Sequence, residues 1–349
     1  MYKNRKIYLL SFYSLSLYPS SCRFFSQACE FNIFDNILLY NEYNLPKDEK
    51  FDKILKDKLK SDIRGFGYWC WKPFIVLKTL EDMENNDILV YADIGCHLSK
   101  DGINRFYEYL DMVIEYESIC STLGFKEKQF TKSDIFNYFN VLNDINITDT
   151  FQRPATFFIL EKTSSNIEFV RKWLNVFYDD FSLVDDSPSK IKNFDGFIEN
   201  RHDQSIFSVL SKIFNIKTID THEFDSNNYK YPILFKRDKK DIYDFIINFS
   251  NCPNIIKNVS WLISSSKYRE MLRKYIKLNL KEFIVLYFKE NKNVSKFKYI
   301  KSGNLFLDII IRIIFNMLKN ELLIGIENTI SSIIGLIKNM SKYGDPFNI

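Results

Sequence analysis

One stretch of ten residues concentrates side chains that suit a phosphate. Residues 64–73 read RGFGYWCWKP and hold two of the 10 glycines and two of the 4 tryptophans of this 349-residue chain. The cationic side chains of Arg64 and Lys72 match phosphate oxygens. Gly65 and Gly67 allow the backbone to turn tightly and to approach a ligand closely. The stretch therefore predicts a loop that binds a phosphate group.

The same stretch supplies aromatic rings. If its backbone is extended, Tyr68, Trp69 and Trp71 alternate in direction, and one side of the loop presents a surface on which a ring can stack. The alternative is that the tryptophans fill the core, as large aromatic side chains often do. Pro73 suits the first turn of a helix, which we expect over residues 73–83.

A carboxylate follows the next apolar segment. In DILVYADIGC, residues 87–96, an apolar strand ends in Asp93, and Gly95 follows two residues later. Open α/β sheets bind their ligands at the carboxyl ends of strands, and a glycine lets a diphosphate or a metal approach the backbone. The alternative is that Asp93 only caps the turn after the strand.

A second polar group opens an apolar helix. In RHDQS, residues 201–205, Asp203 falls in the first helical turn, where the helix dipole favours a carboxylate. Asp203 and Gln204 could face a cleft, or Asp203 could serve only as a helix cap. Of the 3 histidines, His222 follows Asp220 at a strand end and is the best candidate for a metal ligand.

These groups need a sheet to bring them together. Apolar runs at residues 6–14, 36–42, 87–96 and 154–160 have the composition of strands, and helical patterns such as residues 47–61 lie between them. This alternation predicts an α/β fold with a Rossmann-type, mostly parallel sheet flanked by helices.

The chain divides into two regions by composition. Beyond about residue 250 the segments are helical and rich in Ile, Leu, Lys and Asn. We therefore expect a catalytic domain over 1–250 and a helical C-terminal region over 251–349, with a boundary near 245–260. The six cysteines form no CxxC pair and read as reduced thiols of a cytosolic protein. No signal peptide and no transmembrane helix are expected.

The charge is unevenly distributed. The chain has 48 Lys and Arg residues, of which 16 lie from residue 251 onward, and 44 Asp and Glu residues, of which 7 lie there. The basic surplus therefore belongs to the C-terminal region. Basic amphipathic helices bind anionic membranes, which predicts a cytoplasmic protein, peripheral at the inner face of the cytoplasmic membrane. The alternative is that these helices pack on the catalytic domain with their lysines solvated. The acidic first 250 residues would repel a nucleic acid, so none is expected as a partner.

Six segments, taken in order, resemble a group of bacterial GT-A-type glycosyltransferases of capsular and lipopolysaccharide synthesis. They are RGFGYWCWKP, DILVYADIGC, TKSDIF, QRPATFFIL, RKWL and HDQSIF. The resemblance covers about residues 5–235, and the first two segments are the most specific. It implies a GT-A fold and transfer of a sugar from a nucleotide-diphosphate donor to a hydroxyl of a glycan or lipid-linked acceptor.

The resemblance also implies roles for single residues. Asp93, Asp203 and Gln204 are expected at the reaction centre. Ser11, Phe12 and Tyr13 are expected beside the nucleotide base of the donor. The other candidates for donor binding are Arg64, Gly67, Tyr68, Trp69, Lys72, Gly95 and Lys132.

The resemblance also implies a divalent metal, but this chain lacks one of the two carboxylates that usually bind it. Such enzymes usually hold Mg²⁺ or Mn²⁺ on an Asp-x-Asp pair, whereas this chain has Gly95 in place of the second carboxylate. Two arrangements stay open. Asp93 could bind a metal with a further ligand such as His222, or Arg64, Lys72 and Lys132 could neutralise the diphosphate.

Two other functions compete with a glycosyltransferase. A sugar-phosphate nucleotidyltransferase shares the fold class but usually carries a glycine-rich loop after the first strand, and SFYSLSLYPSS, residues 11–21, has no glycine. A non-enzymatic scaffold at a membrane surface would account for the basic C-terminal region and would leave the aromatic loop unexplained.

Overall fold

The computed structural model describes residues 1–60, 62–239 and 266–289, together with a few single positions beyond residue 239. Two compact units are present. The first holds residues 1–14 and 23–238, and the second holds residues 15–22 and the described residues from 239 onward. The domain boundary expected near 245–260 falls in a segment that, apart from residue 256, lies outside the described residues.

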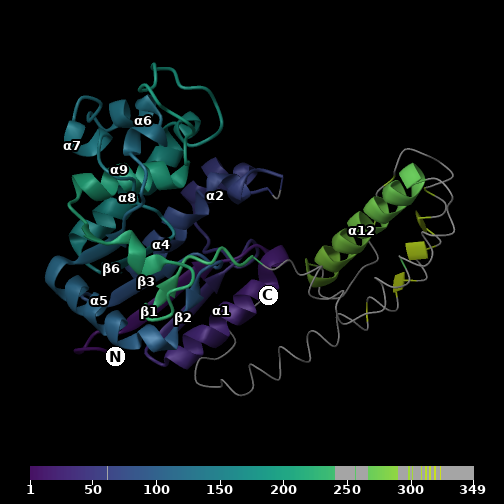
Figure 1. The fold of residues 1–349 in the computed structure, drawn as a ribbon, viewed down its shortest axis with the longest axis horizontal. Coiled ribbons are helices and arrows are strands. Elements are labelled where there is room, and N and C mark those ends of the chain that lie inside the picture. Colours follow the sequence, from purple (N-terminus) through teal and green to yellow (C-terminus); the bar gives the residue numbers. More distant parts are fainter. Residues whose placement is uncertain are drawn as a thin grey trace. The chain divides into compact units, whose positions relative to one another are not determined.

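A six-stranded sheet forms the centre of the first unit (Figure 1). Its strands, in spatial order, are β2 (Asn36–Tyr40), β1 (Ile7–Phe12), β3 (Ile88–Ala92), β6 (Phe157–Glu161), β5 (Ser118–Ser121) and β7 (Lys217–Ile219). β2 and β3 pair in parallel with β1, and β7 with β5, whereas β6 is antiparallel to both of its neighbours. The mostly parallel α/β fold expected from the sequence is confirmed. β4 (His97–Leu98) and β8 (Ile233–Leu234) form a second, antiparallel sheet.

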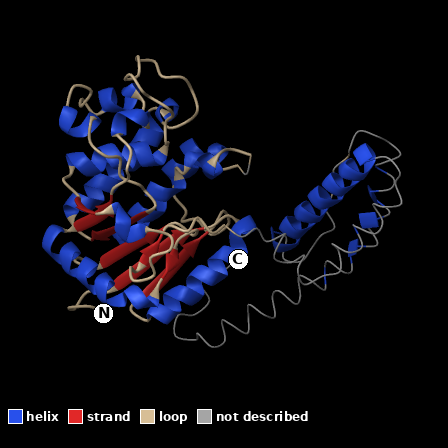
Figure 2. Cartoon of the chain, viewed as in Figure 1, coloured by secondary structure: helices blue, strands red, loops and turns tan. Residues whose placement is uncertain are grey.

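Helices cover both faces of the six-stranded sheet (Figure 2). The near-continuous apolar sequences of β1, β3 and β6 require this, because strands buried on two faces need cover on both. The α-helices of the described residues in the first unit are α1 (Tyr18–Phe31, whose first residues belong to the second unit), α2 (Glu49–Leu55), α3 (Gly65–Tyr68), α4 (Trp71–Asp82), α5 (Ile103–Tyr116), α6 (Ser133–Tyr138), α7 (Ile145–Thr148), α8 (Ser164–Asp179) and α9 (Asp203–Ile213). The second unit contains α12 (Ser266–Lys289), which is not part of this cover.

One face of the sheet carries the side chains that matter for function. Alternate residues of a strand share a face, and Tyr91 of β3 stacks on Phe158 of β6 with 4.9 Å between ring centroids. Phe158 in turn contacts Trp173 of α8. On the opposite face, Tyr109 of α5 contacts Phe157. Helices α4, α8 and α9 therefore share the face of the sheet to which Tyr91 belongs.

An apolar stripe runs along α12, one of the helices expected in the basic C-terminal region. Leu272, Ile276, Leu280 and Phe283 are buried, and the Phe283 ring lies 5.6 Å from that of Phe315. The stripe is therefore covered within the second unit. Among the described helices, none combines the length and the apolar character that a membrane span needs.

Candidate functional site

The carboxyl ends of β1 and β3 meet where the strand order of the sheet reverses. β1 has β2 on one side and β3 on the other, and α/β sheets bind ligands at such a point. Asp93 follows β3 at this edge, and its N–H donates to the carbonyl of Thr156 at 2.8 Å. Its carboxylate Oδ1 accepts the hydroxyl of Tyr91 at 2.8 Å. The Asp93 side chain keeps 33 % of its surface exposed, so it can contact a ligand.

Lys72 and Asp203 complete a charged cluster with Asp93. Lys72 is the second residue of α4, and Asp203 is the first of α9. The Lys72 Nζ lies 3.2 Å from Asp93 Oδ1 and 3.2 Å from Asp203 Oδ2, and it donates to the carbonyl of Ala155 at 3.0 Å. Lys72 and Asp203 are only 3 % and 4 % exposed. The structure thus brings three expected site residues together, with the lysine bound to carboxylates.

Burial and charge compete in this cluster. Burial raises the pKa of Asp203 to about 6; the Lys72 ammonium opposes this rise, and the neighbouring Asp93 carboxylate adds to it. For Lys72, burial lowers the pKa, but the charges of Asp203 and Asp93 more than offset burial, and its pKa is raised above the ordinary value. Lys72 is therefore a buried ammonium ion, and Asp203 is a carboxyl group that titrates near pH 6.

The stretch RGFGYWCWKP is not extended, which corrects the expectation of alternating aromatic side chains. Residues 65–69 all have positive φ, between 51° and 91°, and form a left-handed turn. Such backbone costs a non-glycine residue about 1–2 kcal/mol. The indole N–H of Trp71 donates to the carbonyl of Gly65 at 3.0 Å. α4 begins at Trp71, two residues before Pro73, so Lys72 lies on a helix.

Asp186 holds this turn against the start of α9. Its carboxylate accepts the hydroxyl of Tyr68 at 2.9 Å. It also lies 3.5 Å from the guanidinium of Arg64 and 3.7 Å from His202 Nε2. Arg64, expected to face a phosphate, is thus half-exposed and beside a carboxylate, and the turn and α9 are joined through one acidic residue.

His202 fixes the backbone just before Asp203. It is buried, its φ is 57°, and its ring stacks on Trp69 with 5.6 Å between centroids. Nδ1 lies 2.6 Å from the carbonyl of Val184, an acceptor, so Nδ1 carries the proton and donates it. Burial lowers the pKa of His202, and the ring is therefore neutral. Strained backbone at this position sets the direction of the Asp203 carboxylate.

A cavity of about 330 Å³ lies beside the turn. Its apolar wall includes Tyr43, Leu45 and Phe66, and its polar wall includes Glu42 and Asp52. Five lining residues follow β2, namely Glu42, Tyr43, Leu45, Pro46 and Lys47. Because β2 is parallel to β1 and β3, this wall belongs to the same edge of the sheet as Asp93. Small-molecule sites typically measure about 300–1,000 Å³, and the cavity is of the size of a nucleoside.

Three residues expected beside the nucleotide base lie inside the protein at the end of β1. Ser11 donates to the carbonyl of Ala92 at 2.7 Å and ties β1 to β3. The hydroxyl of Tyr13 accepts from Asn41 Nδ2 at 3.0 Å. Ser11 and Tyr13 have no exposed surface, and Phe12 is 5 % exposed. These side chains support the edge of the sheet, and the cavity lies next to them.

Two glycines expected at the donor make room for other parts of the chain. A Cβ at Gly95 would lie 3.3 Å from the Cα of Arg237, and the Gly95 carbonyl accepts the N–H of Asp238 at 3.0 Å. Gly67, with a φ of 91°, would bring a Cβ within 3.0 Å of the Lys58 carbonyl oxygen. Gly95 therefore packs closely against the backbone of Arg237 and Asp238, and this contact places Arg237 near the sheet edge that holds Asp93.

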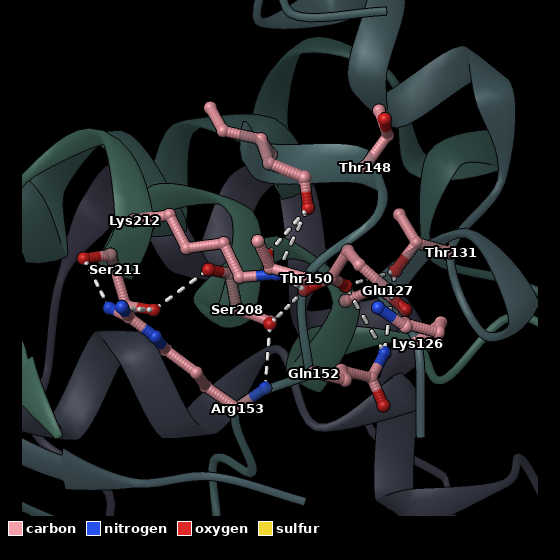
Figure 3. A network of polar contacts seen from close by, with 12 residues as sticks. Lys126, Glu127, Thr131, Thr148, Thr150, Gln152, Arg153, Ser208, Ser211 and Lys212 are labelled. Carbon is pink, nitrogen blue, oxygen red and sulfur yellow. Dashed lines mark hydrogen bonds and ion pairs between the residues drawn. The ribbon is translucent and has the colours of Figure 1, made fainter. Parts of the chain in front are cut away.

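Gln204 joins a buried polar network through Gln152, and Figure 3 shows the part of this network around Gln152, Glu127 and Lys212. Gln204 Nε2 donates to Gln152 Oε1 at 2.8 Å, and Gln152 Nε2 donates to Glu127 Oε1 at 3.3 Å. Glu127 has no exposed surface; it forms an ion pair with Lys212 and accepts the hydroxyl of Ser208. The network ties α9 to the segment that carries Glu127, and it holds the Gln204 side chain in place.

Lys132 and His222 have partners of their own. Lys132 Nζ donates to two backbone carbonyls, at 2.8 and 3.0 Å, in the segment that carries Asp186. His222 is 62 % exposed, with Nδ1 2.8 Å from Asp220 and Nε2 3.1 Å from the hydroxyl of Tyr231. Lys132 thus anchors a loop, and the contacts of His222 lie around its own turn.

Sequence reasoning missed three residues at this edge. Tyr91 lies two positions before Asp93, and the period of a strand would have placed both on one face. Arg201 precedes Asp203 by two positions, and its guanidinium lies 3.9 Å from the ring of Phe130. Burial lowers the pKa of Arg201, Glu199 opposes this, and the charge of Arg237 adds to the lowering. The Arg201 guanidinium also lies 3.7 Å from the carboxylate of Glu199. Only the folded chain brings Arg237 there.

Comparisons with known proteins give no family. No family model matches the chain, and no curated protein matches it.

Solved structures are similar to it at low identity. A glycosyltransferase involved in glycosylation of the major capsid of PBCV-1 is 8 % identical, with a TM-score of 0.37 over 67 % of this chain and 96 % of that one. Mouse xyloside xylosyltransferase 1 is 11 % identical, with a TM-score of 0.35 over 62 % and 84 %. The 4-diphosphocytidyl-2C-methyl-D-erythritol synthase of Anaerococcus prevotii is 13 % identical, with a TM-score of 0.31 over 62 % and 89 %. The similar structures thus include glycosyltransferases, and at these values the likeness carries no argument about activity.

Proposed function

We propose that this chain is a glycosyltransferase that uses a nucleotide-diphosphate sugar. The observation that carries the proposal is a partly exposed carboxylate, Asp93, on the same sheet edge as a cavity of nucleoside size. A sugar nucleotide has an aromatic base with a ribose, a charged diphosphate and a sugar rich in hydroxyls. This edge offers a complementary group for each of those three parts.

The nucleoside would fill the cavity of 330 Å³. Phe66 and Tyr43 offer ring faces to the base, since aromatic rings stack in offset arrangements. The carboxylates of Glu42 and Asp52 are acceptors suited to the ribose hydroxyls. The Phe66 ring lies 6.1 Å from that of Phe12, so the base would sit directly outside the end of β1.

The diphosphate would lie between the cavity and Asp93, with Arg201 and Arg237 as its cations. A guanidinium group can bind a phosphate through two N–H groups. Asp93 would accept hydroxyls of the donor sugar. Asp203 would act through Lys72, which joins it to Asp93.

A donor screen tests the proposal. The full chain is incubated with UDP-sugars and GDP-sugars, and the release of the nucleoside diphosphate is followed. We expect release from one donor class, about 100-fold slower in Asp93→Asn, whereas Asp101→Asn, an exposed aspartate in another turn, should match the wild type.

The same screen separates the alternatives. A parallel series with nucleoside triphosphates and sugar phosphates follows pyrophosphate, and its release would favour a sugar-phosphate nucleotidyltransferase. If neither product forms and no nucleotide binds, a non-enzymatic scaffold would replace the enzyme.

We further propose that the acceptor is a glycan or a lipid-linked glycan met at the cytoplasmic face of a membrane. The basic surplus from residue 251 onward supports this, as do the exposed lysines 267 and 274 of α12. Because the apolar stripe of α12 is buried, the attraction would be electrostatic and screened by salt. Sedimentation with phosphatidylglycerol vesicles should show binding at low salt and release at high salt. Absence of binding at every ionic strength would contradict the proposal.

A further inference from the structure

The charged cluster already contains a cation. The Lys72 ammonium donates one hydrogen bond, to the Ala155 carbonyl, and forms ion pairs with two carboxylates. Asp93 Oδ1 and Asp203 Oδ2 lie at 3.2 Å each, and the carbonyl oxygen of Ala155 lies at 3.0 Å. The Tyr91 ring centroid lies 5.2 Å from Nζ. With 3 % exposure, the side chain has no room to turn its charge toward water.

A divalent metal does not fit between the two carboxylates. Mg²⁺ binds carboxylate oxygens at about 2.1 Å, so an ion that joins Asp93 to Asp203 would compete for the space of the Lys72 nitrogen. The double charge of the metal would also be repelled by the ammonium at this short distance. Asp93 Oδ1 also accepts the hydroxyl of Tyr91 at 2.8 Å. Among the described residues, no three His, Cys, Asp or Glu side chains gather to hold an ion.

We propose that Lys72 is the permanent cation of this site and takes the place of a divalent metal between Asp93 and Asp203. It is a positioning residue, because it acts through the two carboxylates it joins. The proposal rests on the proposed function only for the identity of the bound anion. With Asp203 ionised the cluster of Lys72, Asp93 and Asp203 has a net charge of −1, so in the proposed function the diphosphate would need cations outside the cluster.

Binding of Mn²⁺ without any nucleotide tests the proposal. The full chain, freed of metal by a chelator, is titrated with Mn²⁺, and the free ion is followed by its electron paramagnetic resonance signal. We expect wild type and Asp93→Asn to give the same titration. Lys72→Met keeps much of the side-chain volume and removes the charge, so the two carboxylates lose their counter-ion. This variant should gain one Mn²⁺ per chain with a Kd lower than that of wild type by about tenfold or more.

Two further variants make the result specific. Lys72→Arg keeps a cation and should exclude Mn²⁺ as the wild type does, and Lys72→Met combined with Asp93→Asn should lose the gained site. One Mn²⁺ per wild-type chain that Asp93→Asn abolishes would overturn the proposal. A folded Lys72→Met variant that binds no Mn²⁺ would also overturn it. If Lys72→Met does not fold, as circular dichroism would reveal, the comparison of wild type with Asp93→Asn still decides.

These measurements need no donor sugar. If no donor in the screen releases its nucleoside diphosphate, the proposed function is wrong, but the Mn²⁺ titrations still test the role of Lys72. A wild-type Mn²⁺ site at Asp93 would remove the role of Lys72 and leave the transferase intact.

Discussion

The indole N–H of Trp71 donates to the carbonyl of Gly65 across a turn in which every residue has a positive φ. Gly65 is required there for two reasons. Its φ is +61°, and a Cβ would lie 2.4 Å from ring carbons of Trp69. Because the same turn presents Phe66 to the cavity, a defect at Gly65 should affect both the stability and the ligand site.

Gly65→Ala should lower the free energy of unfolding by about 3 kcal/mol, through left-handed backbone and overpacking together. Two other glycines separate these causes. Gly196 has a φ of +83° and open space around its Cβ position, and Gly124 has open space and no positive φ. We expect a loss of about 1 kcal/mol for Gly196→Ala and less than about 0.5 kcal/mol for Gly124→Ala. Urea denaturation measures all three, and equal losses for Gly65→Ala and Gly196→Ala would contradict the packing argument.

Phe66→Leu should weaken nucleotide binding. It keeps an apolar side chain in the cavity wall and removes the ring face, and stacking of a base on an aromatic ring is worth about 1–3 kcal/mol. We expect the Kd for the nucleoside diphosphate of the active donor to rise about tenfold in calorimetry. The control is Ile54→Ala on α2, an exposed apolar residue that is not part of the lining. Equal affinities for wild type and Phe66→Leu would place the base elsewhere.

Arg237→Gln should weaken binding of the diphosphate by removing one of its two proposed cations. We expect about a tenfold rise in Kd, together with a weaker dependence of affinity on salt. Lys236→Gln is the matched control, because Lys236 carries the same charge one residue earlier and its ammonium lies 4.6 Å from the ring of Tyr229. Similar losses in the two variants would mean that only the overall charge of the segment matters.

Asp203 should make stability depend on pH. Burial raises its pKa from 3.8 to about 6, so the native state holds this proton more tightly than the unfolded chain does. Its contribution is complete below about pH 4 and is lost as the pH rises through about 6. The stability of wild type relative to Asp203→Asn, which cannot titrate, should therefore fall by about 1–3 kcal/mol between about pH 4 and pH 7. A difference that stays flat across this range in denaturant titrations would argue against the raised pKa.

The parts of the site that could be predicted depend on local sequence pattern. A continuous apolar run from Ile88 to Ala92 is a buried strand whatever surrounds it, and this places Asp93 at a carboxyl end. An acidic residue ahead of an apolar helical stripe likewise places Asp203 at a helix start. Tyr91 could have been added from the period of the strand alone.

The remainder depends on contacts between distant segments. Phe66, Tyr68 and Trp69 all have positive φ, against the preference of bulky residues, and tertiary contacts such as the hydrogen bond from Tyr68 to Asp186 hold them there. The start of α4 at Trp71 turns Lys72 inward, toward acceptors from three other segments. No local pattern encodes those partners, and none encodes the cavity between the loop after β2 and the turn.

The ion pair of Glu127 and Lys212 (Figure 3) joins α9 to the segment around Glu127 within the buried interior. Removing one partner of a buried pair costs about 3–5 kcal/mol, so we expect α9 to belong to the most stable part of the first unit. Its amide hydrogens should be among the last to exchange with deuterium. Residues 185–200 contain neither helix nor strand, and their backbone amides should exchange sooner than those of α9.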